Sequence, residues 1–282
     1  MKHKMPFTRR AKQGFTTSNA KQKALLKLQL WQGRRSQSIQ HDQTKARLFY
    51  TMFSKKSIEK VVSLALEKEK ELNRLPLDSI DICISTGNSK IGKTMNISTM
   101  PILCCGNCGE CKKLCYDIKA CLQYPNTVID ARMRNTVLFK RNRSEYFRRI
   151  EAAIERRRTN KYFRWHVAGD IIDVDYFDSM VKIARRHPDF TFWTYTKMYN
   201  VVNEWCSWHI NKRDAIPANL HVMFSEWRGM PMHNPYGFPE FRVVFNDDAV
   251  KPYGFYCPGN CDVCKAANRG CIAGETTYCN EH

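Results

Sequence analysis

Eleven of the thirteen cysteines lie in two short segments of this 282-residue chain. Six lie between residues 104 and 121, five lie between residues 257 and 279, and only Cys83 and Cys206 stand alone. In a reducing compartment, cysteines clustered this densely bind metal more often than they form disulfides. The sequence therefore predicts a metal at each segment, and it predicts that Cys83 and Cys206 are simply buried side chains.

The first segment, CCGNCGECKKLC, offers two overlapping ligand patterns. One has the spacing of bacterial iron–sulfur ferredoxins and comprises Cys105, Cys108, Cys111 and Cys115. The other comprises Cys104, Cys108 and Cys111. It resembles the motif of radical S-adenosylmethionine enzymes, in which three thiolates hold a [4Fe–4S] cluster and leave the fourth iron open for the cofactor. Gly106 and Gly109 would let either loop curl around one small site.

The second segment, CPGNCDVCKAANRGC, places four thiols within fifteen residues: Cys257, Cys261, Cys264 and Cys271. Such a set suits a structural zinc ion or an auxiliary iron–sulfur cluster. Because the first segment has ferredoxin-like spacing, we favour iron–sulfur over zinc, and zinc remains the alternative. The positions of Cys121 and Cys279 leave the exact ligand sets open.

Residues 87–94, GNSKIGKT, match the P-loop of nucleotide hydrolases. A working P-loop needs a helix directly after it, because the helix N-terminus binds the phosphates. The following residues, MNISTMPILCCGNCG, include Pro101 and Gly106 and show no helical period. We therefore expect a tight turn leading toward the cysteines, and nucleotide hydrolysis is the disfavoured alternative.

Alternating helices and strands must position the thiols. The patterns predict helices at 54–74, 126–140, 144–158, 174–187 and 198–211, and strands at 80–85, 162–169, 190–197, 219–227 and 241–246. This alternation predicts an α/β fold with a parallel, partial (β/α) barrel-like sheet whose functional groups lie at the carboxyl ends of the strands. We expect a basic, partly helical arm (1–50), an α/β core (51–250) and a metal-binding tail (251–282).

The formal net charge is +19, and residues 1–50 carry twelve Lys or Arg against one acid. Residues 132–164 add twelve basic residues against three Glu. The electrostatic field of so many positive charges predicts a nucleic-acid partner. The alternative is that these charges only form a solvated tail and a solvated helix face. The expected contacts in the arm are Arg9, Arg10, Lys12, Lys21, Lys23, Lys27, Arg34 and Arg35.

No apolar run approaches the roughly 20 residues needed to cross a bilayer, and the first residues lack the apolar core of a secretory signal. We therefore expect a cytoplasmic protein without a membrane partner. The sequence predicts no oligomeric state.

Five blocks occur in order along residues 84–282: GNSKIGKTMNISTMP, CGECKKLCYDIKACLQYPN, FRWHVAGDI, FTFWTYTK and CPGNCDVC. Together they resemble the phage "gene product 88" family, which occurs in phages and integrated mobile elements and has no established biochemical function. The chain has Asp117 and Ala168 where family members commonly have Ala and Ser. The resemblance implies a bacterial or phage-infected host, and its Cys-Tyr pair implies that Cys115 is a ligand.

The expected strand 162–169 ends in VAGD, where radical S-adenosylmethionine barrels carry a glycine-rich turn beside the cofactor. By this resemblance Gly169 and Asp170 would shape a cofactor pocket, and Thr196 and Lys197 end the next strand on the same rim. An ordinary strand-to-helix turn with a solvent-facing Asp170 is the alternative. His166 is expected to be a packed strand residue.

The leading hypothesis is an iron–sulfur protein of a phage or mobile element, acting as a radical S-adenosylmethionine-like enzyme on nucleic acid or a small molecule. The competing hypothesis is a non-enzymatic, zinc-stabilised nucleic-acid-binding protein.

Overall fold

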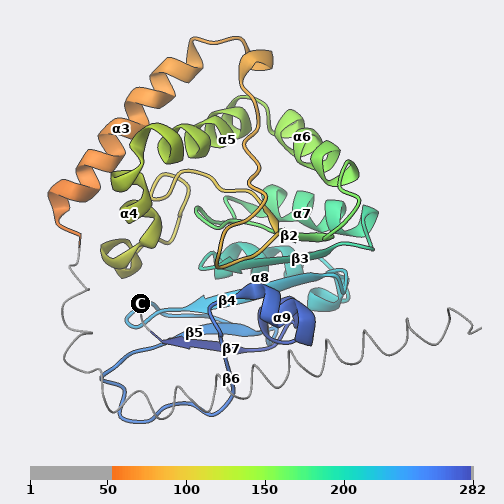
Figure 1. Ribbon diagram of the computed structural model, residues 1–282. Helices are drawn as coiled ribbons and strands as arrows, with labels where there is room; N and C mark the ends of the chain where they lie inside the picture. The colour runs from red at the N-terminus through yellow and green to blue at the C-terminus, as the bar shows by residue number, and fades with distance from the viewer. Residues whose placement is uncertain (1–52, 281–282) are drawn as a thin grey trace, which may run out of the picture.

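Seven parallel strands form one sheet in the order β1-β2-β3-β4-β5-β7-β6 in the computed structural model, which describes residues 53–280 (Figure 1). The strands are β1 (Met95–Asn96), β2 (Tyr162–Arg164), β3 (Thr191–Thr196), β4 (Leu220–Glu226), β5 (Glu240–Val244), β6 (Phe255–Tyr256) and β7 (Thr277–Asn280). The first five follow one another in chain order, as in a (β/α) barrel, but the sheet does not close. The prediction of a parallel α/β architecture is confirmed.

The helices are α3 (Lys55–Asn73), α4 (Tyr116–Gln123), α5 (Asp130–Arg141), α6 (Arg143–Glu155), α7 (Val174–Arg186), α8 (Tyr199–Ser207) and α9 (Cys261–Ala267). Short turns of other helix types are η1 (Leu77–Ser79), η2 (Glu110–Leu114), η3 (Pro125–Ile129), η4 (Lys212–Ala215) and η5 (Gly270–Ala273). Ser54 caps α3 and Asp173 caps α7, each accepting a hydrogen bond from a first-turn amide. None of the helices among residues 53–280 is long and apolar enough to span a membrane.

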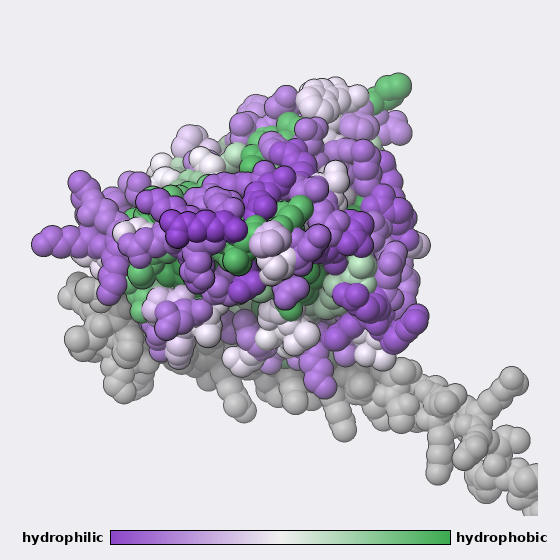
Figure 2. All heavy atoms as spheres, turned by 90° about the horizontal axis from the view of Figure 1, so that it is seen from above, coloured by the Kyte–Doolittle hydropathy of each residue, from purple (hydrophilic) through white to green (hydrophobic). Residues whose placement is uncertain are grey.

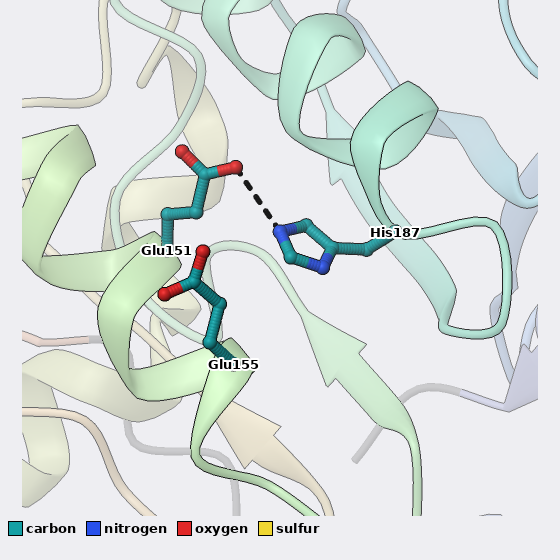
Figure 3. A group of neighbouring side chains, drawn as sticks. All are labelled: Glu151, Glu155 and His187. Carbon is teal, nitrogen blue, oxygen red and sulfur yellow. Dashed lines mark hydrogen bonds and ion pairs between the residues drawn. The ribbon is translucent and has the colours of Figure 1, made fainter.

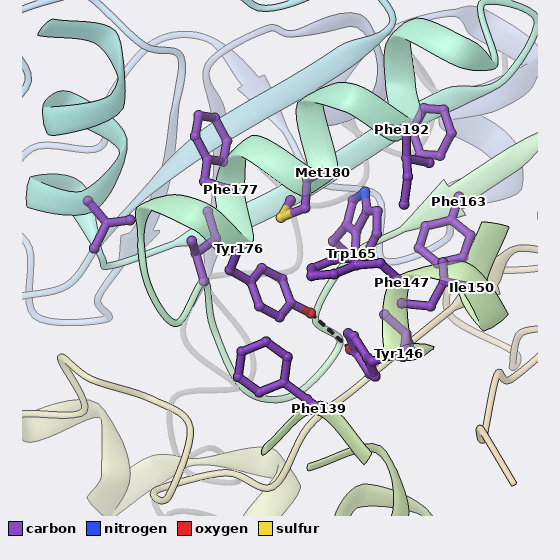
Figure 4. Close-up of a cluster of buried hydrophobic side chains, with 14 of the residues drawn as sticks. Phe139, Tyr146, Phe147, Ile150, Phe163, Trp165, Tyr176, Phe177, Met180 and Phe192 are labelled. Atoms are coloured by element: carbon purple, nitrogen blue, oxygen red, sulfur yellow. Dashed lines mark hydrogen bonds between the residues drawn. The ribbon is translucent and has the colours of Figure 1, made fainter. Parts of the chain in front are cut away.

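Alternate strand residues face two different cores. Phe192 and Phe224 lie in the main core with the large helices, which Figure 4 shows as a cluster of aromatic rings around Tyr176 and Trp165. Trp193 and Met223 point to the opposite face, where they pack against the tail residues of α9 and η5. Strand β7 pairs with β5, so the cysteine-rich tail extends the sheet as well as covering it.

The predicted strand at 80–85 is wrong. Only Ser85 forms an isolated bridge, with Asn96, and the first strand comes after the glycine-rich turn. The reason lies in Asn135 of α5, whose buried amide accepts from Cys83 N at 2.8 Å and donates to Cys83 O at 2.9 Å. Because this side chain satisfies the backbone groups of Cys83, the segment needs no strand partner.

Two other boundaries differ from expectation. Strand β2 stops at Arg164, because His166 adopts a positive φ of 52° that a strand cannot continue. His166 is nevertheless packed, as predicted, with its ring hydrogen-bonded to the hydroxyl of Tyr176. The expected helix at 126–140 begins with the π-turn η3, and the α-helical part starts at Asp130.

Residues 87–94 form a braced turn. Asn88 Oδ1 accepts from the amides of Lys90 and Ile91, and strand β1 follows Thr94 in place of a helix. The turn holds the tail, since Lys90 O accepts from Cys261 N and Ile91 O accepts from Lys265 Nζ. The expected absence of a helix is confirmed, and the P-loop match describes a structural turn.

We predict that Gly87→Ala lowers the free energy of unfolding by more than about 2 kcal/mol. Gly87 has a φ of 121°, and a Cβ there would lie 1.8 Å from the carbonyl oxygen of Gly92. The matched control is Gly229→Ala, because Gly229 also has a positive φ but a Cβ there would meet no atom within 4 Å; it should cost about 1 kcal/mol. Equal losses in thermal unfolding would show that the turn is not constrained as described.

Candidate metal centre

The cysteine loop that follows β1 lies over the carboxyl ends of β2 and β3. Thr99 N donates to Ala168 O at 3.1 Å, and Asp170 N donates to Cys104 O at 3.0 Å. Farther along, Asn107 Nδ2 donates to Lys197 O at 3.1 Å. The loop cysteines and the rim residues that follow β2 and β3 are therefore brought to one edge of the sheet, as the strand order requires.

Asp170 fastens this edge. Its Oδ1 accepts from Ile171 N at 2.7 Å and its Oδ2 accepts from Lys197 N at 2.9 Å. The side chain is buried, so the alternative of a solvent-facing Asp170 is wrong. Burial raises the pKa of Asp170, and hydrogen bonds from Thr196 and the two backbone amides oppose that rise. The carboxylate holds the backbone of the site together.

Gly169 and Thr196 shape the same corner. Gly169 has a φ of 83°, and a Cβ there would lie 2.0 Å from Thr99 Oγ1, so no other residue fits. The hydroxyl of Thr196 accepts from Met198 N at 2.9 Å. Both residues therefore position the backbone around the loop.

Three loop thiols gather at this edge: Cys105, Cys108 and Cys111. Hydrogen bonding to Cys105 raises the pKa of Cys108 to about 11, although Cys111 opposes this rise. Contact with Cys108, followed by burial, raises the pKa of Cys111, while the nearby Lys197 lowers it. The raised pKa values keep Cys108 and Cys111 protonated, and a cation placed beside them would favour their thiolates.

Cys115 and Cys104 differ in their relation to this group. Cys115 is the N-cap residue of α4, and burial raises its pKa while the amides of Ile118 and Asp117 oppose the rise. Cys104 is buried on the core side, with its sulfur 3.7 Å from Thr136 Oγ1. Of the adjacent pair, Cys105 is the one that lies with the other loop thiols.

Three further cysteines, Cys121, Cys206 and Cys279, are buried, whereas Cys83 is not. Cys206 and Cys121 are fully buried, and burial raises their pKa to about 11 and about 12. Cys83 is partly buried. The prediction of simple burial is confirmed for Cys206, and Cys279 lies buried in β7.

The tail thiols form a second group against the face of β3. Burial raises the pKa of Cys264, and the other members of the group raise it further: Cys257, Cys261 and Cys271. Burial raises the pKa of Cys271 to about 12, whereas hydrogen bonds from Thr277 and Tyr195 lower it. A hydroxyl donor such as that of Tyr195 stabilises the thiolate of a buried sulfur, which is the form that binds metal, whereas the hydroxyl of Thr277 donates to Glu275 O at 2.8 Å.

Both groups offer only sulfur, and as they stand neither is drawn as close together as the ligands of a bound zinc ion. Tetrahedral zinc with Zn–S bonds of about 2.3 Å separates its sulfurs by about 3.8 Å. Among residues 53–280, no three cysteine sulfurs lie within 4.8 Å of one another. An iron–sulfur cluster binds each thiolate to a different iron and so takes a wider set. The loop group fits such a cluster in ligand type.

Three other possible metal ligands do lie within 4.8 Å of one another. They are Glu151 and Glu155 of α6 and His187 after α7 (Figure 3). Both oxygens of Glu151 are already taken by Arg186, at 2.5 and 2.8 Å, and one of them also lies 3.0 Å from His187 Nε2. The contact with Arg186 lowers the pKa of Glu151. These residues form an ion-pair network that ties α6 to α7, and a metal would have to displace the arginine.

The arginines of residues 132–164 are mostly engaged within the fold. Their ion pairs are Arg132–Asp117, Arg134–Asp130, Arg143–Asp173, Arg148–Glu145 and Arg149–Glu145. The face seen from the side of α3, α5 and α6 is mostly hydrophilic, with apolar side chains showing between (Figure 2). Paired charges on this face contribute little to a field for a polyanion. The eight expected contacts in the arm lie outside the described residues.

Several residues around the thiols have no signal in the sequence. Arg164 is only one of many charges along the chain, yet its guanidinium lies 4.6 Å from the centre of the Tyr195 ring. Asp117, a departure from the resembled family, is buried and paired with Arg132 at 3.1 Å. Neither role has a local sequence pattern, because each depends on elements distant in the chain.

A family model described as Gene product 88 matches residues 66–234. This range includes the loop cysteines and strands β1 to β4, and it ends before the tail cysteines. No curated protein and no solved structure matches the chain. The comparisons therefore lend no support to the likeness to radical S-adenosylmethionine enzymes.

We predict that Asp170→Asn lowers the free energy of unfolding by about 1–3 kcal/mol, because one backbone amide would face the new NH₂ group without an acceptor. Amide hydrogen exchange in residues 97–115 should also become faster, since the carboxylate organises that edge. Asp81→Asn is the control, because Asp81 is exposed and forms no ion pair in the described part of the chain. Chemical denaturation that gives equal stability for wild type and Asp170→Asn would contradict this role.

Proposed function

We propose that this chain, which belongs to the Gene product 88 family, is an iron–sulfur protein whose loop cysteines hold a cluster at the carboxyl edge of the sheet. The observation that carries the proposal is the gathering of Cys105, Cys108 and Cys111 beside Asp170 and Lys197. The ferredoxin-like spacing of these thiols along the sequence favours a cluster over a single ion. A bound cluster would supply one-electron chemistry at this edge.

The number of loop ligands decides what the cluster does. Three thiolates leave one iron open, and we propose that the open iron would bind S-adenosylmethionine in a radical enzyme acting on a small molecule or nucleic acid. Adding Cys115 would close the cluster, as in an electron-transfer ferredoxin. Cys115 lies near enough to Cys111 for their charges to interact, so both sets are compatible with the fold.

We propose that the tail cysteines hold a second metal, either an auxiliary cluster or zinc. Four thiols are close enough to perturb one another, and the hydroxyls of Tyr195 and Thr277 reach Cys271. The braced turn at 87–94 fixes this segment through Cys261 and Lys265. Zinc here would stabilise the tail as a structural ion does.

The state of the cysteines bears on the cellular compartment of the protein. All thirteen cysteines are free, which suits a reducing environment. We propose that the protein acts in the cytoplasm of a bacterium or an infected host.

We predict that anaerobically purified protein is brown and contains iron and sulfide in equal amounts. Cys108→Ser should lose most of the loop iron, because Cys108 interacts with both neighbouring loop thiols. Cys104→Ser and Cys206→Ser should retain it, since both sulfurs lie in the core. Cys264→Ser should lower only the tail metal, and Cys115→Ser tests whether a fourth thiolate is used.

The readouts are iron, sulfide and zinc determination with the visible absorption spectrum. Colourless wild-type protein with stoichiometric zinc would refute the iron–sulfur proposal. Equal iron in wild type and Cys108→Ser would refute the loop assignment specifically. Circular dichroism of each variant shows whether it has kept its fold.

A second proposal concerns nucleic acid, and it rests on the twelve basic residues in positions 1–50. Removing residues 1–50 should weaken retention on duplex DNA or RNA at low salt and flatten the dependence of affinity on salt. Filter binding across a salt series measures this. An unchanged titration after the deletion would contradict the proposal.

A further inference from the structure

Arg164 lacks the partners that most arginines in the described part of the chain possess. Others pair with carboxylates or donate to backbone carbonyls, as Arg149 and Arg213 do. Arg164 forms no ion pair among residues 53–280, and its Nε–H is buried without a hydrogen-bond partner. The residue as a whole is only partly buried, so solvent still reaches it. A guanidinium held in this state has an open donor site.

The position of Arg164 is fixed by the sheet. It is the last residue of β2 and lies opposite Trp193 of β3, and its guanidinium extends along the neighbouring strand to the ring of Tyr195. The ring offers cation–π attraction but no anionic oxygen. The side chain is thus oriented by packing while its charge stays unpaired.

Lys197 presents a second unpaired cation on the same face. It follows β3 directly, and its Nζ contacts Ser225, which alternates with Phe224 along β4 and so lies on the face of Met223. Its Nζ donates to Ser225 Oγ at 3.1 Å and lies 5.9 Å from the ring of Trp227. No carboxylate pairs with it in residues 53–280. Arg164 and Lys197 are therefore two cations without carboxylate partners on the same face of the sheet.

The surroundings place these cations between the two cysteine groups. Burial opposes the charge of Arg164, yet its pKa is raised overall because Tyr195, Tyr116 and the thiols of Cys261 and Cys271 lie near. Tyr116 follows the loop cysteines directly and is 58% exposed. Lys197 lies near Cys111 of the other group, since its charge lowers the pKa of that thiol.

We propose that Arg164 and Lys197 bind the oxyanion, a carboxylate or phosphate, of a small-molecule ligand on the sheet face between the two cysteine groups. The parallel N–H groups of the arginine fork match two oxygens of such a group, and the lysine adds a point charge. The proposal deepens the proposed function by naming the ligand's chemistry. The binding step itself does not depend on which metal the thiols hold.

The test is a titration of anaerobically purified protein, with its native metal content, by sodium acetate and separately by sodium phosphate. Chloride keeps the ionic strength constant. The readout is tryptophan fluorescence, because Trp193 lies opposite Arg164 and Trp227 lies beside Lys197. The anion that binds more tightly identifies the ligand group as carboxylate or phosphate, and either result supports the proposal.

Arg164→Gln should raise the dissociation constant at least tenfold, and Lys197→Gln should raise it severalfold. Arg164→Lys keeps the charge but loses the fork, so it should fall between Arg164→Gln and wild type. The matched control is Arg156→Gln, which removes the same charge from an exposed arginine without an ion pair in the described part of the chain and should change the constant less than twofold.

Two results would overturn the proposal. One is a wild-type protein that shows no saturable response to either anion. The other is an Arg164→Gln variant that binds the anion as wild type does while its metal content or reduction potential changes, which would make Arg164 a counter-charge for the thiolates. Saturable binding by protein that contains no iron would uphold this inference and refute the iron–sulfur proposal, so the two can fail separately.

Discussion

The buried carboxylate of Asp170 joins the three segments on which the candidate site is built. It follows β2, its own amide donates to the carbonyl of Cys104 in the cysteine loop, and its oxygens accept from Ile171 and from Lys197 after β3. A buried carboxylate is costly unless such donors surround it. Here the cost is offset by backbone groups that would otherwise be left unpaired at the ends of two strands. The site is therefore anchored by main chain, whereas its thiols and cations remain available.

The second constraint is the use of both faces of the sheet. The large helices fill one face, so the other face is left for the tail, whose α9 and η5 pack on Trp193 and Met223. The turn at 87–94 holds α9 in place, because Lys90 O accepts from Cys261 N and Ile91 O accepts from Lys265 Nζ. As a result, cysteines that are about 150 positions apart in the chain flank the same strands, with Arg164 between them.

Much of the fold could be predicted from local patterns. Strand 191–196 is a continuous run of aromatic and β-branched residues, strand 220–226 contains the apolar run VMF, and Ser54 and Asp173 are ordinary helix caps. The false strand at 80–85 has the same composition as a real one. Only the distant amide of Asn135 decides against it. The P-loop match at 87–94 is also misleading because of a distant contact. Its glycines form a turn that holds Cys261 and Lys265 of the tail.

The candidate site could be predicted only in part. Cysteine spacing identifies the two groups, but it cannot choose between Cys104 and Cys105, because that choice depends on which side of the loop faces the core. The roles of Asp170 and Arg164 depend on strand neighbours, which have no signature in a single sequence. The VAGD sequence predicts that Asp170 faces solvent or a cofactor. In the structure its carboxylate instead accepts hydrogen bonds from the backbone amides of Ile171 and Lys197.

X-ray absorption on anaerobically purified protein tests the central claim most directly, because it reports which element the thiols bind and at what distance. The account predicts an iron edge with a first shell of sulfur and a second shell of iron, as a cluster requires. A zinc edge alone, with four sulfurs at about 2.3 Å, would contradict it.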